Sequence, residues 1–141
     1  MKNLSLLNFF LDNTFSPNLA RALVLMADAD PDSIRCVRDH YGKDPGDDVW
    51  LRDVKLWSGD WIILSGDGRI TKNPVLREIY LSSGRPMYVM PSAFQNKTRW
   101  LQASSFCKWF PDIQKHASKV SGAMCFNVRE NGAIEARNIK S

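Results

Sequence analysis

The sequence predicts an α/β fold in which a mainly parallel sheet is covered by helices on both faces. Short apolar runs alternate along the chain with segments of helical periodicity, a pattern typical of parallel strands joined by crossover helices. An Asn-Gly pair at 131–132, between two further alternating runs, predicts a terminal hairpin. With 141 residues and 44% hydrophobic content, the chain suits one domain with a substantial core and leaves little room for a second.

The first apolar stretch, residues 6–13 (LLNFFLDN), anchors this interpretation. A short run of Leu and Phe bounded by turn residues is typical of a buried strand, although the same run also fits a buried helix segment. Ser16 and Pro17 favour the strand, because an N-cap hydroxyl followed by proline marks the start of a helix. Apolar residues then recur at helical spacing through 18–27. Asp12 is therefore predicted in the loop between a buried strand and a helix.

Similar signals define the remaining elements. Residues 60–65 (DWIILS) are the best strand candidate, because aromatic and β-branched residues form one continuous run. Pro111 predicts a break or kink in the last helical segment. The other predicted elements are a strand at 33–37, a polar loop at 39–47, a helix at 48–57 capped by Asp47, a helix that starts at Asn73 and Pro74 and stops at Gly84, a strand at 86–90, a helical segment at 97–120, and hairpin strands at 122–129 and 133–138.

Charge and cysteine content narrow the functional classes. Nineteen Lys and Arg residues against fifteen acids give a mild basic excess, which suits a polyanionic partner without requiring one. Three cysteines at wide spacings, with no Cys-x-x-Cys pair, indicate neither a disulfide framework nor a zinc site. The apolar run near the N-terminus is too short to span a bilayer and has no signal cleavage site. We therefore expect a cytoplasmic protein that has no membrane partner.

Acidic residues follow the predicted strands in a repeated pattern. Asp12 ends the first strand, Asp67 follows the third, and Asp48 or its neighbour Asp47 begins the intervening helix. The carboxyl ends of parallel strands meet at one edge of the sheet, so these carboxylates are predicted to converge there. The alternative is structural, because Asp often shapes turns and an acid in the first turn of a helix is stabilised by the helix dipole.

Crowded carboxylates destabilise a fold unless a cation neutralises them, and aspartate oxygens suit Mg²⁺ or Mn²⁺. Such an ion, alone or as one of a pair, can activate water and stabilise the leaving oxygen of a phosphodiester. The sequence contains no P-loop, serine elbow or dinucleotide-binding motif, and neither His40 nor His116 lies at metal-motif spacing. Metal-assisted phosphodiester hydrolysis is therefore the most specific chemistry that the residues predict.

The order of the segments FFLDN, SPNLARAL, VRDHYG, GDDVWL and WIILSGDGRITKNP resembles that of the PIN domain, in particular its compact branch, which includes VapC-type toxins of bacterial toxin–antitoxin pairs. The resemblance covers about residues 6–90, with the helix and hairpin of 97–139 as an addition. It implies a three-layer α/β/α fold and a Mg²⁺- or Mn²⁺-dependent endoribonuclease with an RNA substrate and an inhibiting protein antitoxin. It also implies association of two copies as a dimer.

Carried over by position, the catalytic and metal-binding acids are Asp12, Asp48 or Asp47, and Asp67. Asn13 and Ser65 are expected to support them. Two departures from the family pattern stand out: Gly66 replaces a basic residue that is frequent in the compact branch, and Gly68 and Arg69 stand where a fourth acid would be. The second departure motivates an alternative, a catalytically silent PIN-like module that binds RNA or a protein.

Basic and aromatic side chains are the candidates for RNA contacts. Arg69, Lys72 and Arg77 follow the Asp67 loop and could contact phosphates, although solvated surface charge is the simpler account of any one of them. Trp50, Trp57 and Trp61, like the three cysteines, are expected in the core. An aromatic set in the last helix is also expected in the core, with base stacking or partner docking as the alternative; this set is Trp100, Phe106, Trp109 and Phe110. A third functional alternative is a phosphoacceptor domain of receiver type. It is disfavoured because such a domain needs a lysine at the end of a late strand, where this chain has Met90 and Pro91.

Overall fold

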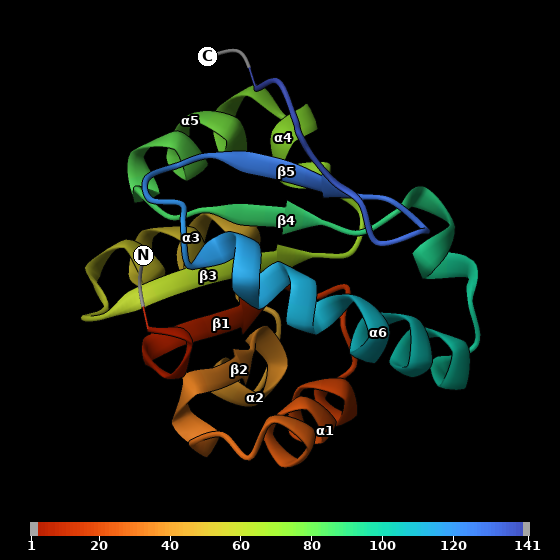
Figure 1. Cartoon of the computed structure of the whole chain (residues 1–141). Helices are drawn as coiled ribbons and strands as arrows, with labels where there is room; N and C mark the ends of the chain where they lie inside the picture. Colours follow the sequence, from red (N-terminus) through yellow and green to blue (C-terminus); the bar gives the residue numbers. More distant parts are fainter. Residues whose placement is uncertain (1–2, 140–141) are drawn as a thin grey trace.

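A computed structural model describes residues 3–139 and has three layers, with a six-stranded sheet between two layers of helices (Figure 1). The strands, in chain order, are β1 (Leu7–Leu11), β2 (Ile34–Cys36), β3 (Asp60–Ser65), β4 (Met87–Val89), β5 (Cys125–Val128) and β6 (Ile134–Ala136). The helices are α1 (Pro17–Ala27), α2 (Val37–Tyr41), α3 (Asp47–Leu56), α4 (Arg69–Lys72), α5 (Pro74–Ser83) and α6 (Arg99–Ala117), with 3₁₀ turns at Leu4–Leu6, Pro31–Ser33 and Ser92–Asn96. The predicted α/β class and the mainly parallel sheet are confirmed.

The strand order β2-β1-β3-β4-β5-β6 creates a topological switch point between β1 and β3. From β1 the chain moves to β2 on one side, and it then crosses back to β3 on the other side. Phe9 of β1 accordingly lies opposite Ile34 of β2 and Ile62 of β3, both in parallel register. Loops that leave neighbouring strands in opposite directions open a crevice at the carboxyl edge, where ligands of open α/β sheets bind. In Figure 1 the arrows of β3, β4 and β5 all point toward this edge.

The terminal hairpin extends the sheet rather than standing apart from it. Its first strand, β5, pairs in parallel with β4, and β6 then returns antiparallel along the outer edge. Arg129 and Ala133 close the turn through a backbone hydrogen bond of 2.8 Å, and Gly132 supplies the positive φ of 89° that the Asn-Gly pair predicts. The predicted hairpin is confirmed, and it carries the carboxyl edge of the parallel sheet one strand further.

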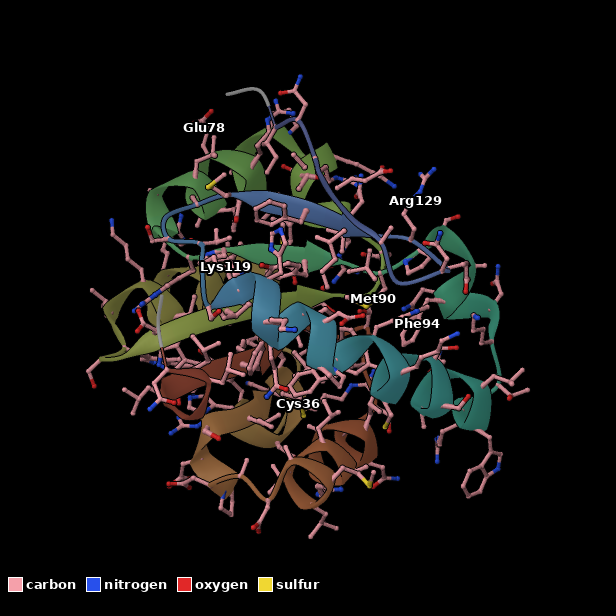
Figure 2. The ribbon with its side chains drawn as sticks, viewed as in Figure 1. Cys36, Glu78, Met90, Phe94, Lys119 and Arg129 are labelled. Atoms are coloured by element: carbon pink, nitrogen blue, oxygen red, sulfur yellow. The ribbon has the colours of Figure 1, made fainter. Side chains whose placement is uncertain are left out.

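The core divides into two clusters, one on each face of the sheet. Phe9 and Leu11 of β1 pack with α1 and α6 on one face, whereas Phe10 between them packs with α2, α3, α4 and α5 on the other. Strands that are buried on both faces read as continuous apolar runs, as β1 and β3 do. Met90 and Phe94, beyond the end of β4, belong to the cluster covered by α6 (Figure 2).

Two predicted helix starts are confirmed by their capping hydrogen bonds. The Ser16 hydroxyl accepts from the backbone N–H of Asn18 at 3.2 Å, with Pro17 as the first helical residue. Asn73 accepts from the N–H groups of Val75 and Leu76, with Pro74 as the first helical residue. These local signals place α1 directly after the Asp12 loop and α5 shortly after the Asp67 loop.

Four details differ from the predictions. The segment predicted as a loop at 39–47 begins inside α2, a five-residue helix closed by Gly42 in the left-handed region. Asp47 does not cap α3, because it is the first residue of the helix itself and its carboxylate is turned toward other partners. The helix α6 continues through Pro111 without a break, since the proline lies on the exposed side. The single turn α4, directly after the Asp67 loop, has no counterpart in the prediction.

The aromatic predictions are confirmed in most positions. Phe106, Trp109 and Phe110 are buried, as are Trp50 and Trp61, and Trp57 is half-buried. Trp100 is the exception, with 85% of its surface exposed at the start of α6. Cys36 and Cys125 are buried and Cys107 is half-buried. Within residues 3–139, no helix is both long enough and apolar enough to cross a bilayer.

Candidate active site

Asp12 is a buried carboxylate at the switch point of the sheet. It follows β1 directly, its N–H donates to the Leu64 carbonyl at 2.9 Å, and only 2% of its surface is exposed. One carboxylate oxygen accepts hydrogen bonds from the backbone N–H and the hydroxyl of Thr14, and the Ser65 hydroxyl also donates to the group. Burial raises the pKa of Asp12 from its ordinary 3.8 to about 6, although these hydrogen bonds lower it, and the negative charge of Asp67 adds to the rise.

The same two hydroxyls join the loops that follow β1 and β3. Thr14 Oγ1 accepts from the backbone N–H of Gly66 at 2.8 Å, and Ser65 Oγ accepts from the N–H of Gly68 at 3.1 Å. Each hydroxyl therefore donates to Asp12 and accepts from a backbone N–H of the Asp67 loop. The sequence interpretation included Ser65 but missed Thr14; an Asp-x-Thr spacing, which favours a local hydrogen bond back to the Asp, was the available signal.

This close contact explains why a glycine occupies position 66. A Cβ atom there would overlap the hydroxyl of Thr14 and the side-chain amide of Gln95. Gln95 is exposed and could move away, but Thr14 is held between Asp12 and the Gly66 N–H. A basic residue at this position, as expected from the compact branch, would displace the threonine that orients Asp12.

Asp67 lies on the loop after β3, near Asp12 but more exposed. Its carboxylate accepts from the backbone N–H of Arg69 at 3.0 Å, which shapes the turn into α4. Its charge raises the pKa of Asp12, so the two carboxylates lie within electrostatic reach of each other. The structure thus brings together the acids that follow β1 and β3, as the parallel topology predicts.

Of the two adjacent acids at the start of α3, only Asp47 faces this site. Arg69 donates two hydrogen bonds to the Asp47 carboxylate, from Nε at 3.0 Å and from Nη2 at 3.3 Å, and the Trp50 indole N–H donates a third at 3.0 Å. Asp48 points into solvent, where it pairs with Arg52 at 3.5 Å. The structure therefore does not bring Asp48 to the acidic cluster, because the two side chains leave the helix in different directions.

Arg69 is the cationic centre of the cluster. Its hydrogen bonds to Asp47 raise its pKa most, and the negative charges of Asp47, Asp67 and Asp12 raise it further. The guanidinium therefore lies within electrostatic reach of all three carboxylates. The position where a fourth acid is expected in the family thus carries the opposite charge.

The other predicted site residues lie around this cluster. Asn13 bridges two neighbouring segments, because its amide donates to Asp44 and its carbonyl accepts from Arg38. Lys72 is exposed and lines a groove beside Asp67. Arg77 is directed back onto α4, where it donates to the Thr71 carbonyl at 3.4 Å. Of the three basic residues predicted to contact RNA, Arg69 and Lys72 therefore border the acidic edge.

The donor set fits a divalent ion held by two carboxylates rather than three. Among residues 3–139, no group of three or more His, Cys, Asp or Glu side chains is placed to hold a metal ion. Asp48 is turned away and Asp47 is engaged by Arg69, which leaves Asp12 and Asp67. Mg²⁺ is commonly bound through one or two carboxylates with waters completing its coordination, so this pair remains chemically suitable.

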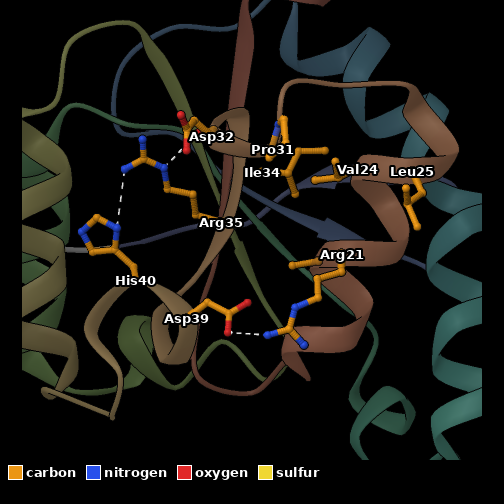
Figure 3. A pocket seen from close by; sticks show the side chains of 10 residues that line it. Arg21, Val24, Leu25, Pro31, Asp32, Ile34, Arg35, Asp39 and His40 are labelled. Carbon is orange, nitrogen blue, oxygen red and sulfur yellow. Dashed lines mark hydrogen bonds and ion pairs between the residues drawn. The ribbon is translucent and has the colours of Figure 1, made fainter.

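A separate cavity of about 630 Å³ lies beside β2, between α1 and α2 (Figure 3). Three of its charged side chains are bonded within its own walls: Arg21 pairs with Asp39 at 2.8 Å, and Arg35 donates to the Asp32 backbone carbonyl at 2.8 Å. None of the acids at the switch point lines it. Although this cavity is larger than the groove beside Asp67, the acidic edge is the better candidate for chemistry.

Comparison with known proteins agrees with this geometry. A family model described as "PIN like domain" matches residues 7–92, which is more than half of the chain and includes Asp12, Asp47 and Asp67. No curated protein and no solved structure gives a significant match. The chain belongs to the PIN-like domain family, whose members are generally nucleases and typically use divalent metal ions.

Proposed function

We propose that the protein is a metal-dependent endoribonuclease and the toxin of a type II toxin–antitoxin pair. One observation carries the enzymatic part: the buried Asp12 lies within electrostatic reach of Asp67 at the switch point of a PIN-like sheet. A carboxylate whose pKa is raised by burial gains most from a nearby cation. The geometry therefore supports a cation site at the edge where a phosphodiester would bind.

In this proposal Asp12 and Asp67 hold Mg²⁺ or Mn²⁺ through their carboxylate oxygens. The bound ion would supply a water of lowered pKa and stabilise charge on the phosphodiester oxygens. Thr14 and Ser65 fix the orientation of Asp12, since both donate to its carboxylate. Arg69, whose side chain is half exposed, keeps a positive charge beside both acids and can face the charge that develops on the phosphate.

The toxin assignment adds a protein antitoxin that covers this edge in the cytoplasm. The exposed apolar side chains of Trp100 and Leu101 support a protein partner, because α6 begins on the side of the molecule where β4 ends (Figure 1). Isolated large apolar groups are common on surfaces, but an indole that is 85% exposed favours contact with another molecule. Dimerisation of the chain stays a prediction from the family resemblance.

Arg69 favours one alternative function, a catalytically silent module that binds RNA or a protein. Its guanidinium engages Asp47, one of the acids predicted to bind the metal ion. A site of two carboxylates binds metal more weakly than a site of three or four. In a silent module, the arginine would serve as the permanent counterion and the cluster would have a purely structural role.

The deciding experiment compares cleavage of a mixed RNA pool by wild type, Asp12→Ala and Asp48→Ala, each with Mn²⁺ and with EDTA. We expect metal-dependent cleavage by wild type and by Asp48→Ala, and none by Asp12→Ala. Asp48→Ala is the matched control, because it removes a neighbouring aspartate that lies outside the cluster. Circular dichroism of all three proteins checks folding.

Equal cleavage by wild type and a folded Asp12→Ala variant would refute the nuclease proposal. RNA binding that is unaffected by EDTA, without cleavage by any variant, would favour the silent module. Growth arrest on expression of wild type, relieved by Asp12→Ala, is the expected result for a toxin.

A further inference from the structure

The groove next to Asp67 has the size and lining of a nucleotide site. Its volume is about 430 Å³, within the range of small-ligand pockets, which begins at about 300 Å³. Its walls come from the carboxyl ends of β3, β4 and β5 and from the segment that follows β6. The end of β5 and the segment after β6 lie outside residues 7–92, so the hairpin adds one wall of the groove to the part of the chain that matches the family.

Basic side chains dominate the charged part of this groove. Lys72, Arg129 and Arg137 line it, against the acids Asp67 and Glu130. Glu130 is already paired with Lys97 at 3.0 Å, which leaves the basic groups in excess. Arg129, labelled in Figure 2 beside the turn after β5, is only loosely paired with Glu135 at 3.7 Å. In the part of the chain from 3 to 139, neither Lys72 nor Arg137 forms an ion pair.

Arg137 is held in a fixed orientation at the back of the groove. Its Nε donates to Thr71 Oγ1 at 3.1 Å, and its Nη1 donates to Asn127 Oδ1 at 2.8 Å. A Cβ on residue 68 would lie 2.9 Å from Val89 Cγ1 and 3.1 Å from Nη2 of Arg137, and the φ of 69° also favours glycine there. The guanidinium is therefore packed against the residue that follows Asp67, and its charge is already in position to meet a phosphate.

The remaining lining suits a base. Val89, Met90 and Val128 are almost completely buried and form an apolar floor. Ser92 and Asn127 add polar groups at its side, and the Asn127 amide keeps its N–H donors because its oxygen is the atom that binds Arg137. An apolar floor with a few polar groups and a cationic wall is complementary to a single unstacked nucleotide.

We propose that this groove binds one nucleotide of a single-stranded RNA substrate beside the cleaved phosphodiester, with Lys72 and Arg137 contacting its phosphate. The proposal rests on the RNA substrate of the proposed function and narrows it to unpaired RNA. Duplex RNA is excluded because its stacked bases cannot enter a groove of this size. The C-terminal hairpin then contributes directly to substrate binding.

Fluorescence anisotropy with a labelled single-stranded RNA octamer in EDTA tests the groove without requiring cleavage. The full chain is compared with Lys72→Ala, Arg137→Ala and Lys119→Ala. We expect the first two variants to bind about tenfold more weakly and to lower the slope of log affinity against log salt by about 0.7 each. Lys119→Ala should bind like wild type, because this exposed lysine lies on the opposite side of the view from Arg129 (Figure 2).

Folding does not confound the result. Lys72 is exposed and its side chain makes no hydrogen bond within the described residues, so its removal leaves the fold intact. Arg137→Lys complements Arg137→Ala, because lysine keeps the positive charge but cannot donate to both Thr71 and Asn127 as the guanidinium does. We expect this variant to bind RNA with intermediate affinity. An unlabelled single strand should compete for binding, whereas the same sequence in a duplex should not.

The outcomes separate this proposal from the proposed function. Wild-type affinity and salt slope in Lys72→Ala and in a folded Arg137→Ala would overturn the groove as the RNA site, as would no RNA binding by wild type or equal competition by the duplex. If wild type cleaves RNA with Mn²⁺ but these variants bind normally, only the groove proposal fails. If the variants lose binding but wild type never cleaves, the groove stands and the nuclease proposal fails.

Discussion

Replacing Asp12 by asparagine should stabilise the metal-free protein at neutral pH, because it removes a charge from a site with 2% exposure. The pKa of Asp12 lies at about 6, against an ordinary value of 3.8. Ionising this carboxyl in the folded state therefore costs about 3 kcal/mol relative to the unfolded chain. The amide keeps one oxygen to accept from Thr14 but loses the hydrogen bond donated by Ser65, which offsets about 1 kcal/mol.

The net gain of about 2 kcal/mol should raise the unfolding midpoint by about 6 °C at pH 7. The sign follows from proton linkage. Between pH 4 and 6 the folded state holds the Asp12 proton more tightly than the unfolded state, so wild-type stability falls as pH rises through this window. The advantage of Asp12→Asn should consequently be complete above pH 6 and disappear near pH 4, where folded wild type holds the proton and the unfolded chain is only about half ionised.

Divalent ions should reverse the order of the two proteins. A ligand at about 100 times its dissociation constant stabilises the folded state by about 2.7 kcal/mol, and Asp12→Asn loses one of the two proposed carboxylate ligands. The assay is urea unfolding followed by tryptophan fluorescence, at pH 4 and pH 7, with EDTA or with Mn²⁺. Asp48→Asn, at an exposed site, is the control and should change stability by less than about 0.5 kcal/mol. Equal stabilities of wild type and Asp12→Asn at pH 7 in EDTA would show that the buried charge of Asp12 does not destabilise the folded protein.

Two further variants test the neighbours of Asp12. Thr14→Val should destabilise the protein by about 2 kcal/mol in urea unfolding, because it removes a donor to Asp12 and leaves the Gly66 N–H without its acceptor. Thr14→Ser keeps the hydroxyl and should restore most of the lost stability. A valine variant as stable as wild type would contradict the proposed link between the loops. Arg69→Gln should lower stability by about 1 kcal/mol in EDTA, since the guanidinium is half exposed, but should increase the stabilisation by Mn²⁺ because Asp47 becomes free to bind the ion. An unchanged response to Mn²⁺ in thermal unfolding would show that Arg69 does not limit metal binding.

The fold was largely predictable because its signals are local. The continuous apolar runs of β1 and β3 and the capping residues Ser16 and Asn73 act within a few residues of chain. The helices α2 and α4 escaped prediction because one turn of helix is too short to display periodicity. Pro111 did not break α6, because Phe110 and Ile113 anchor the buried side of the helix while the proline ring lies on the exposed side.

The site was predictable to the extent that topology determines it. Parallel strands bring the residues that follow β1 and β3 to one edge, and Asp12 and Asp67 do lie together there. The choice between Asp47 and Asp48 could not be made from sequence, because consecutive helical residues point about 100° apart and only the positions of Trp50 and Arg69 decide which acid turns inward.

Charge balance at the carboxyl edge depends on Arg69. The cluster contains three carboxylates, Asp12, Asp47 and Asp67, and one guanidinium, which is hydrogen-bonded to Asp47. With that pair neutral, the two remaining negative charges would be balanced by the single divalent ion of the proposed site. A second ion would leave an excess of positive charge without further carboxylates to hold it. The arrangement therefore favours single-ion rather than two-ion chemistry, and the charge of an incoming phosphate would be met by Arg69 and by the basic wall of the adjacent groove.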